Sequence, residues 1–263
     1  MDFATACFIT KNIFLEVNGM KLQVIGYYGA YPAPETATSS YLLQGKDATV
    51  LLDCGSGALS RLQKYIKVTD LDGVILSHYH HDHMADVGPL QYACLVQNGI
   101  NQTNNVLPIY GHNEDKDSFS KLNHNATKGV AYSAKSPLQI GSLTFTFFKT
   151  VHPVPCFGMR MTNGQQTIVY TADTQYFDEL PKFCEGADLL ITDCSFYEGM
   201  DGSGPGHMTS EECGKLAAKA NVKELWLSHL PHFGSHENLL KEAKQYFHGS
   251  IKLAKEGLTF GES

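Results

Sequence analysis

Short apolar runs alternate with polar, glycine-containing segments along most of the chain. Apolar runs of about five residues between turn residues are typical of strands, and apolar positions three or four residues apart are typical of amphipathic helices. A first strand pattern begins at Met20, and Gly26 and Gly29 mark turns after it. Further strands are predicted at 39–45, 48–53, 73–77, 107–111, 142–151, 157–162, 165–171, 187–193 and 222–228, and helices at 57–66, 84–98, 113–122, 175–184, 209–220 and 237–247.

The order of these elements predicts the fold class. The early strands come in hairpin-like pairs, and the later strands alternate with helices. This mixture favours an α/β (α+β) fold in which two sheets pack face to face with helices outside, in one domain over residues 20–263. Residues 1–19 fit the pattern poorly, and we interpret them as either an N-terminal extension or an extra edge strand.

Composition and charge narrow the possible functions. The chain has 263 residues, of which 43% are hydrophobic and 18% charged, as in ordinary globular proteins. A net charge of −7 without a long basic run argues against a surface built mainly for nucleic-acid backbones. No apolar stretch is long enough for a transmembrane helix. Seven cysteines at irregular spacing, with no C-x-x-C pair, favour a cytoplasmic protein with reduced thiols.

A histidine-rich segment, SHYHHDH at 77–83, carries the strongest indication of chemistry. It follows an apolar strand, and both histidine nitrogen and aspartate oxygen suit Zn²⁺. His78 and His80 are two positions apart, so an extended backbone can point both to the same side. Asp82 and His83 begin the next element and can serve a second ion close by. His81, between the two pairs, is expected to point away from the ions.

Three more candidate ligands stand directly after apolar strands, in the same context as His78. They are His152, Asp173 and His229. Any one of them alone would more often be a structural hydrogen-bonding residue, but the recurrence of one context favours metal ligands. Asp53 also ends a strand, and it is predicted either to hydrogen-bond a metal ligand or to stabilise a turn.

This combined set resembles the metallo-β-lactamase superfamily, from Met20 onward. The resemblance implies a four-layer αββα sandwich with two divalent metal ions between the sheet edges, bridged by a water or hydroxide that acts as the nucleophile of a hydrolase. It implies that one ion is held by His78, His80 and His152, that the other is held by Asp82, His83 and His229, and that Asp173 bridges both. Zn²⁺ is the expected metal, and Mn²⁺ and Fe²⁺ remain open because the same ligands accept them. The H-x-E-x-D-H variant of the oxygen-reducing di-iron members is absent, which argues against a redox function.

Other segments resemble the ribonuclease Z and phosphodiesterase branch. The carboxylate of Asp173 stands where class B β-lactamases usually carry a cysteine, and the loop at 29–41 resembles that of ribonuclease Z. The segments at 191–196 and 207–212 resemble paired motifs that imply catalytic roles for Asp193 and His207, hydrogen-bonded beside the scissile phosphate. By the same resemblance, Asp82 orients the attacking hydroxide. His207 precedes a predicted helix whose N-cap is Thr209 or Ser210.

The chain departs from ribonuclease Z in one respect. Only a β-hairpin fits between His152 and Asp173, so the long arm that grips tRNA is missing. We therefore expect a small-molecule or short phosphodiester substrate, such as a cyclic nucleotide, rather than full-length tRNA.

Several alternatives remain at this stage. The enzyme alternative is a thioesterase or lactonase of the same superfamily, and the non-enzyme alternative is a metal-dependent binding module. Relatives often form homodimers, and the sequence leaves this open. Trp226, Cys54 and Cys194 are interpreted as core residues. His232 and His236 either line the pocket or lie in an exposed loop.

Overall fold

The computed structural model describes residues 19–261, so the predicted N-terminal extension lies outside the described residues except for Gly19. The strands are β1 (Lys21–Gly26), β2 (Ser40–Gln44), β3 (Thr49–Leu52), β4 (Gly73–Ile75), β5 (Leu107–His112), β6 (Thr127–Tyr132), β7 (Leu138–Ile140), β8 (Leu143–Lys149), β9 (Phe157–Thr162), β10 (Thr167–Tyr170), β11 (Leu189–Asp193), β12 (Glu224–Ser228), β13 (Ser250–Leu253) and β14 (Thr259–Phe260). The helices are α1 (Ala58–Leu62), α2 (His81–Met84), α3 (Val87–Asn101), α4 (Lys116–Ser120), α5 (Leu180–Cys184), α6 (Ser210–Lys219) and α7 (His236–Tyr246), with a 3₁₀ turn at Val68–Asp70.

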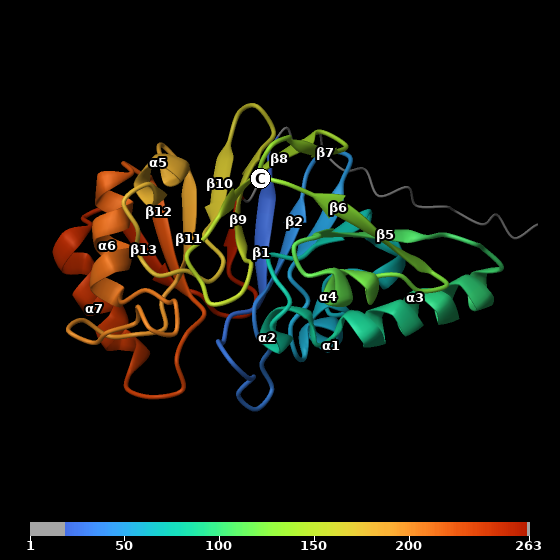
Figure 1. The fold of residues 1–263 in the computed structure, drawn as a ribbon, viewed down its shortest axis with the longest axis horizontal. Helices are drawn as coiled ribbons and strands as arrows, with labels where there is room; N and C mark the ends of the chain where they lie inside the picture. Colours follow the sequence, from blue (N-terminus) through green and yellow to red (C-terminus); the bar gives the residue numbers. More distant parts are fainter. Residues whose placement is uncertain (1–18, 262–263) are drawn as a thin grey trace, which may run out of the picture.

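Within the described residues, the strands form two seven-stranded sheets of mixed direction. One has the order β14-β1-β2-β3-β4-β5-β6, and the other has the order β13-β12-β11-β10-β9-β8-β7. Helices α1, α3 and α4 lie outside the first sheet, and α5, α6 and α7 lie outside the second (Figure 1). The predicted four-layer αββα sandwich is confirmed.

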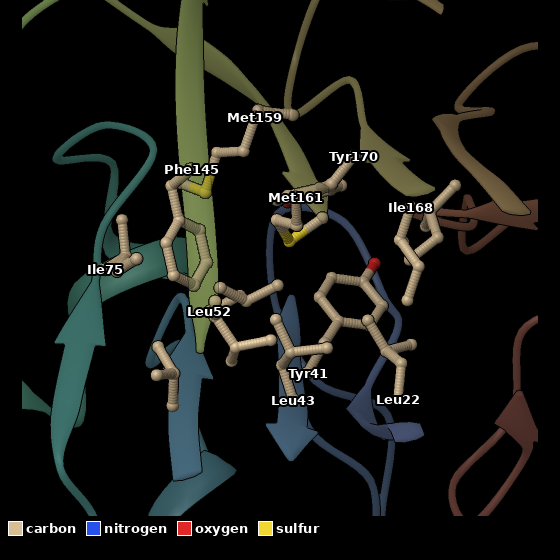
Figure 2. Packing of buried hydrophobic residues seen from close by; sticks show 14 of the residues in the cluster. Leu22, Tyr41, Leu43, Leu52, Ile75, Phe145, Met159, Met161, Ile168 and Tyr170 are labelled. Atoms are coloured by element: carbon tan, nitrogen blue, oxygen red, sulfur yellow. The ribbon is translucent and has the colours of Figure 1, made fainter. Parts of the chain in front are cut away.

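The two sheets are held together by a shared apolar core. Tyr41 and Leu43 from the first sheet meet Phe145 and Met161 from the second, and all four side chains are fully buried (Figure 2). Separate apolar clusters attach each helical layer to the outer face of its sheet. Each such large side chain contributes roughly 1.5–3 kcal/mol through burial, which fixes the relative position of the two sheets. Trp226 is fully buried in the central cluster, as predicted.

The strand directions create the edge on which the candidate site residues lie. Strands β3 and β4 are parallel in the first sheet, and β10, β11 and β12 are parallel in the second. Strand β8 runs in the direction of β10 because both pair antiparallel with β9. The C-terminal ends of these parallel strands therefore lie at one edge of each sheet. Every candidate ligand lies in a segment that begins at one of these strand ends.

Several sequence predictions need correction, and the helices predicted at 57–66 and 113–122 extend only over α1 and α4. The predicted helix at 175–184 is helical only over α5, because the backbone N–H of Gln175 donates to the carbonyl of Val151 and holds the segment before α5 against another strand end. Strands β6, β7, β13 and β14 were not predicted. They lie toward the sheet edges, are short or contain glycine and lysine, and bury few side chains. Among residues 19–261, no helix has both the length and the apolar character that crossing a bilayer would require.

Candidate metal centre and active site

Two groups of histidine and aspartate side chains share Asp173 between the ends of the two sheets. In each group, one potential ligand atom from every residue lies within 4.8 Å of the others. The first group is His78, His80, His152 and Asp173, and the second is Asp82, His83, Asp173 and His229. The structure therefore brings all seven predicted ligands together, in the same two sets that the sequence resemblance implies.

Buried atoms in both groups lack hydrogen-bond partners. His78 Nε2, His83 Nε2 and Asp173 Oδ1 are buried and make no hydrogen bond among the described residues. Yet His83 Nε2 lies 3.2 Å from Asp173 Oδ1, and His78 Nε2 lies 3.7 Å from Asp173 Oδ2. A buried, unsatisfied polar atom costs about 1–3 kcal/mol. Cations between these nitrogen and oxygen donors would satisfy them, so the residues present fit divalent metal ions.

Protonation states in the first group also suit a metal. Burial lowers the pKa of His78 well below its ordinary value, so its imidazole is neutral, which is the form that binds metal. Burial acts against ionisation of Asp173, but His229 and His83 hold the pKa of its carboxyl well below the usual range. A neutral imidazole and an ionised carboxylate are the protonation states that metal coordination requires.

His80 and His152 face each other across the first group. His152 Nε2 lies 3.2 Å from His80 Nδ1, and His152 Nδ1 lies 3.1 Å from the carbonyl oxygen of Gly206. Because a carbonyl only accepts, Nδ1 of His152 carries the proton and Nε2 keeps its lone pair for a metal. Gly206 has φ +80°, and a Cβ there would meet His152 Cα at 3.0 Å, so glycine is required at this position.

Asp53 orients the second group from behind. Its Oδ2 accepts hydrogen bonds from His83 Nδ1 at 2.8 Å, from Ser77 Oγ at 2.8 Å and from the Tyr170 hydroxyl at 3.0 Å. Its Oδ1 accepts from the backbone N–H of Ser77 at 2.7 Å. The bond to Nδ1 directs Nε2 of His83 toward Asp173, as carboxylates do behind metal-binding histidines. The predicted hydrogen bond from Asp53 to a candidate ligand is confirmed.

Replacing Asp53 with asparagine is expected to weaken metal binding by about 10–100-fold, the usual cost of losing a residue that orients a ligand. Competition with a chromogenic chelator measures this affinity. Asp72→Asn is the control, because Asp72 is exposed and accepts from Thr49 at the opposite end of β3. Unchanged affinity in a folded Asp53→Asn variant, judged by circular dichroism, would contradict an orienting role.

Asp82 belongs to the second group and also binds the loop between β1 and β2. Its Oδ2 accepts the backbone N–H of Ala30 at 2.7 Å and lies 3.1 Å from Nε2 of His229. Burial opposes its ionisation, but His83 and His229 lower the pKa of its carboxyl well below the usual range. A Cβ on Gly29 would lie 2.6 Å from Cε1 of His229, so the loop packs directly on this imidazole.

Asp193, the last residue of β11, binds His207 and contacts the second group. Its Oδ2 lies 2.6 Å from Nδ1 of His207. Its Oδ1 accepts from Ser195 Oγ at 2.6 Å, and that hydroxyl lies 2.8 Å from Nδ1 of His229. Both oxygens of Asp193 are thus engaged, although it also falls in a third metal-compatible group with Asp173, His207 and His229. We therefore interpret Asp193 as a partner of the histidines rather than a ligand.

His207 lies beside both groups, and Asp193 holds its imidazole. Burial works against its protonation, but the carboxylate of Asp193 raises the pKa of the imidazole above its ordinary value. Its ring centroid lies 5.1 Å from that of His229 and 5.3 Å from that of His152. With Nδ1 on Asp193, Nε2 is the nitrogen available to a substrate. The helix after His207 begins with a capping box between Thr209 and Glu212, which fixes the end of this loop as predicted.

The backbone is strained at three strand ends beside the site. Asp53, Ala172 and His229 have φ of 55°, 53° and 51°. Positive φ is uncommon in non-glycine residues, and it concentrates where function requires one side-chain direction. In each case the left-handed turn follows a buried strand and precedes or carries a residue of the site.

Some contributors to the site carry no recognisable sequence signal. Ser77, Tyr170, Ser195 and the backbones of Ala30 and Gly206 bind candidate ligands or Asp193 through contacts that depend on tertiary structure. Ser77, Ser195 and Ala30 lie within the segments singled out in the sequence, 77–83, 191–196 and 29–41, but the residue types there do not indicate these contacts. Three residues were predicted to hold no metal, and the structure agrees. His81 is exposed and belongs to neither group, and Cys54 and Cys194 are fully buried in the core.

Comparison with known proteins gives one group of close matches. Residues 48–230 match the family described as "Beta-lactamase superfamily domain". The relative "Probable metallo-hydrolase YhfI" of Bacillus subtilis (strain 168) is 51% identical over 242 residues, which cover 92% of this chain and 99% of the relative. The crystal structure of YhfI matches with a TM-score of 0.91 over the same shares of both chains.

Two further matches are more distant. Ribonuclease Z of Metallosphaera sedula is 24% identical over an alignment of 297 positions, which covers 92% of this chain and 98% of the relative. The crystal structure of "a New Diphosphatase from the PhnP Family" is 18% identical, with a TM-score of 0.74, over 92% of this chain and 97% of that chain. At this level of identity, the diphosphatase shares the fold alone.

Proposed function

The chain belongs to the metallo-β-lactamase superfamily of metal-dependent hydrolases, and from that premise we propose that it hydrolyses small or short phosphodiesters at a dinuclear centre. The expected metal is Zn²⁺. Asp173 would hold both ions, His78, His80 and His152 would hold one, and Asp82, His83 and His229 would hold the other. When bound, two such ions supply Lewis acidity, which acidifies water and neutralises charge on phosphoryl oxygens.

The contact between His207 and Asp193 is the observation that carries this proposal. Asp193 holds Nδ1 at 2.6 Å and leaves Nε2 for a substrate atom. Nε2–H can donate to a phosphoryl oxygen and then transfer its proton to the departing alkoxide. An alkoxide needs that proton to leave, whereas the thiolate released from a thioester is stable without it. A positioned acid therefore favours an oxygen ester of phosphate over a thioester.

Asp82 is assigned to the attacking water. Its carboxylate stays ionised and accepts hydrogen bonds only, so it can orient a water's O–H away from the phosphorus. The backbone N–H of Ala30 fixes this carboxylate from the loop side. Asp82 and His207 would then act at the two ends of the reaction, on the nucleophile and on the leaving oxygen.

The connection between His152 and Asp173 supports a small substrate. Strands β9 and β10 pair as an antiparallel hairpin and take up most of this segment, so it contains no long arm. The distant relative that is named Ribonuclease Z also supports a phosphate ester.

Hydrolysis of bis(p-nitrophenyl) phosphate by the zinc-loaded protein tests the proposal. We expect turnover that is lost on chelation and on His80→Ala replacement. A thioester and a lactone, assayed in parallel, are expected to react far more slowly. Preferential turnover of either acyl substrate would overturn the phosphodiesterase proposal, and tight metal binding without turnover of any ester would favour a binding module.

A further inference from the structure

Exposed apolar side chains occur on four segments that border the candidate site. Of the nine exposed large hydrophobic residues among the described ones, four are Tyr31, Val151, Met200 and Phe233. Tyr31 follows Ala30, which binds Asp82, and Val151 precedes His152. Met200 lies in the loop that leads to His207, and Phe233 follows His229 by four residues. The loop between β1 and β2, which includes Tyr31, projects at the lower edge in Figure 1.

Tyr31 is the outer ring of a stack of three. Its ring lies on that of His232 with centroids 3.7 Å apart and planes 4° apart. His232 in turn stacks on Tyr28 at 4.8 Å and 15°. His232 Nε2 lies 2.6 Å from the carbonyl oxygen of Tyr31 and 3.2 Å from that of Gly29, which fixes the imidazole between the two tyrosines. One face of Tyr31 is covered in this way, yet 58% of the residue is exposed, so its other face is open.

This stack is attached rigidly to the candidate metal centre. The neighbouring residue Ala30 donates to Asp82 at 2.7 Å, and Gly29 packs against the imidazole of His229. His232 itself follows His229 by three residues. The backbone directly before Tyr31 is therefore held against two candidate ligands and does not form a free loop.

A second aromatic row extends from His207. The rings of Phe196 and His207 have centroids 6.3 Å apart, Phe233 lies 6.4 Å from Phe196, and Tyr197 lies 5.7 Å from Phe233. Phe233 adjoins His232 in sequence, so consecutive residues of one loop carry a ring of each row. Flat, partly exposed rings beside an anion-binding centre suit a ligand that combines one phosphate with an aromatic ring.

Charge limits the ligand further. Both arginines of the chain are engaged elsewhere: Arg61 approaches Glu256, and Arg160 donates to the carbonyl oxygens of Phe183 and Glu185. Arginine guanidinium groups bind phosphates well because they can donate two hydrogen bonds at once. Neither arginine is available here to bind a second phosphate group of a substrate. A substrate with a single phosphodiester group fits this site better than an oligonucleotide or a diphosphate.

We infer that the open face of Tyr31, backed by His232, binds the nucleobase of a nucleoside phosphodiester by stacking. This inference rests on the proposed function and names its substrate class. Tyr31 is assigned to substrate binding and not to bond cleavage. Its loss should raise KM for a nucleoside substrate and leave kcat nearly unchanged.

The test compares two substrates with the same leaving group. They are thymidine 5′-(p-nitrophenyl phosphate) and methyl p-nitrophenyl phosphate, which differ only in the presence of the nucleoside. Tyr31→Leu is expected to raise KM for the thymidine ester by about tenfold or more, at the lower end of the range for base–aromatic stacking. The same variant should leave KM for the methyl ester unchanged. Tyr31→Phe keeps the ring and should behave like the wild type.

A binding measurement supplies a readout independent of turnover. Calorimetric titration with thymidine 5′-monophosphate should show tighter binding than with 2-deoxyribose 5-phosphate, and Tyr31→Leu should abolish the difference. Equal KM changes for both esters, or a leucine variant as good as phenylalanine, would overturn the stacking role while the phosphodiesterase function stands. Failure to cleave either ester would instead refute the proposed function, and the calorimetry would still decide whether Tyr31 binds a base.

Discussion

Replacing Asp173 with alanine is expected to remove most of the bound metal and to lower phosphodiester hydrolysis by more than about 100-fold. Asp173 belongs to both groups of candidate ligands, so its loss weakens both ion sites at once. Loss of a residue that only orients a ligand already costs roughly 10–100-fold in metal affinity, and a shared ligand should cost more. Metal content after dialysis, measured by atomic emission, and turnover of bis(p-nitrophenyl) phosphate check the two effects together.

Asp188→Ala is the matched control for Asp173→Ala. Asp188 is a half-buried carboxylate beside the same sheet, but it lies just before β11, where it accepts from the backbone N–H of Thr167 and pairs with Lys223. Its replacement should leave metal content and turnover close to wild type. An Asp173→Ala variant that retains two ions and full activity would show that the shared carboxylate does not hold the metals.

Replacing His207 with alanine is expected to leave the metal content unchanged. It is expected to slow the hydrolysis of phosphodiesters with an alkoxide leaving group by about 10²–10⁴-fold, which is the usual contribution of a general acid. The effect should be much smaller for p-nitrophenyl esters, because p-nitrophenolate leaves without a proton. Paired rate measurements on a methyl and a p-nitrophenyl ester of the same nucleotide provide the test. A smaller loss in the same pattern is expected for Asp193→Asn, since Asp193 holds Nδ1 of His207.

His248→Ala serves as the control for His207→Ala, because His248 is exposed and belongs to none of the metal-compatible groups among the described residues. It should match the wild type on both esters. If His207→Ala slows the two esters equally, the histidine binds phosphate and does not transfer a proton. If it slows neither, its position beside the site has no catalytic consequence.

The candidate ligands could be predicted from the sequence because most of them stand in one local context, whereas their division into two groups came from the family resemblance. His78, His152, Asp173 and His229 each follow an apolar strand, and strand direction alone places such residues at one edge of a sheet. The hydrogen bond from Asp53 to His83 was predictable for the same reason. The single domain over residues 20–263 and the cytoplasmic location stay predictions from the sequence.

The remaining contributors depend on contacts between distant parts of the chain. Ser195 reaches His229 only because β11 and β12 are neighbours, and Tyr170 reaches Asp53 only because the two sheets face each other. The Tyr31–His232 stack joins two loops that no periodic pattern describes. Strand β6 was missed because most of its side chains are not buried and Gly129 interrupts it. Sequence patterns report burial and local direction, whereas these features arise from packing.

Metal titration of activity tests the central claim most directly. Metal-free protein would receive Zn²⁺ in steps while turnover of bis(p-nitrophenyl) phosphate is followed at a protein concentration far above the metal dissociation constants. Two ligand groups that share Asp173 predict activity that rises to a plateau at two equivalents of Zn²⁺ per chain. A plateau at one equivalent would contradict a dinuclear centre, and absence of turnover at any metal content would contradict phosphodiester hydrolysis.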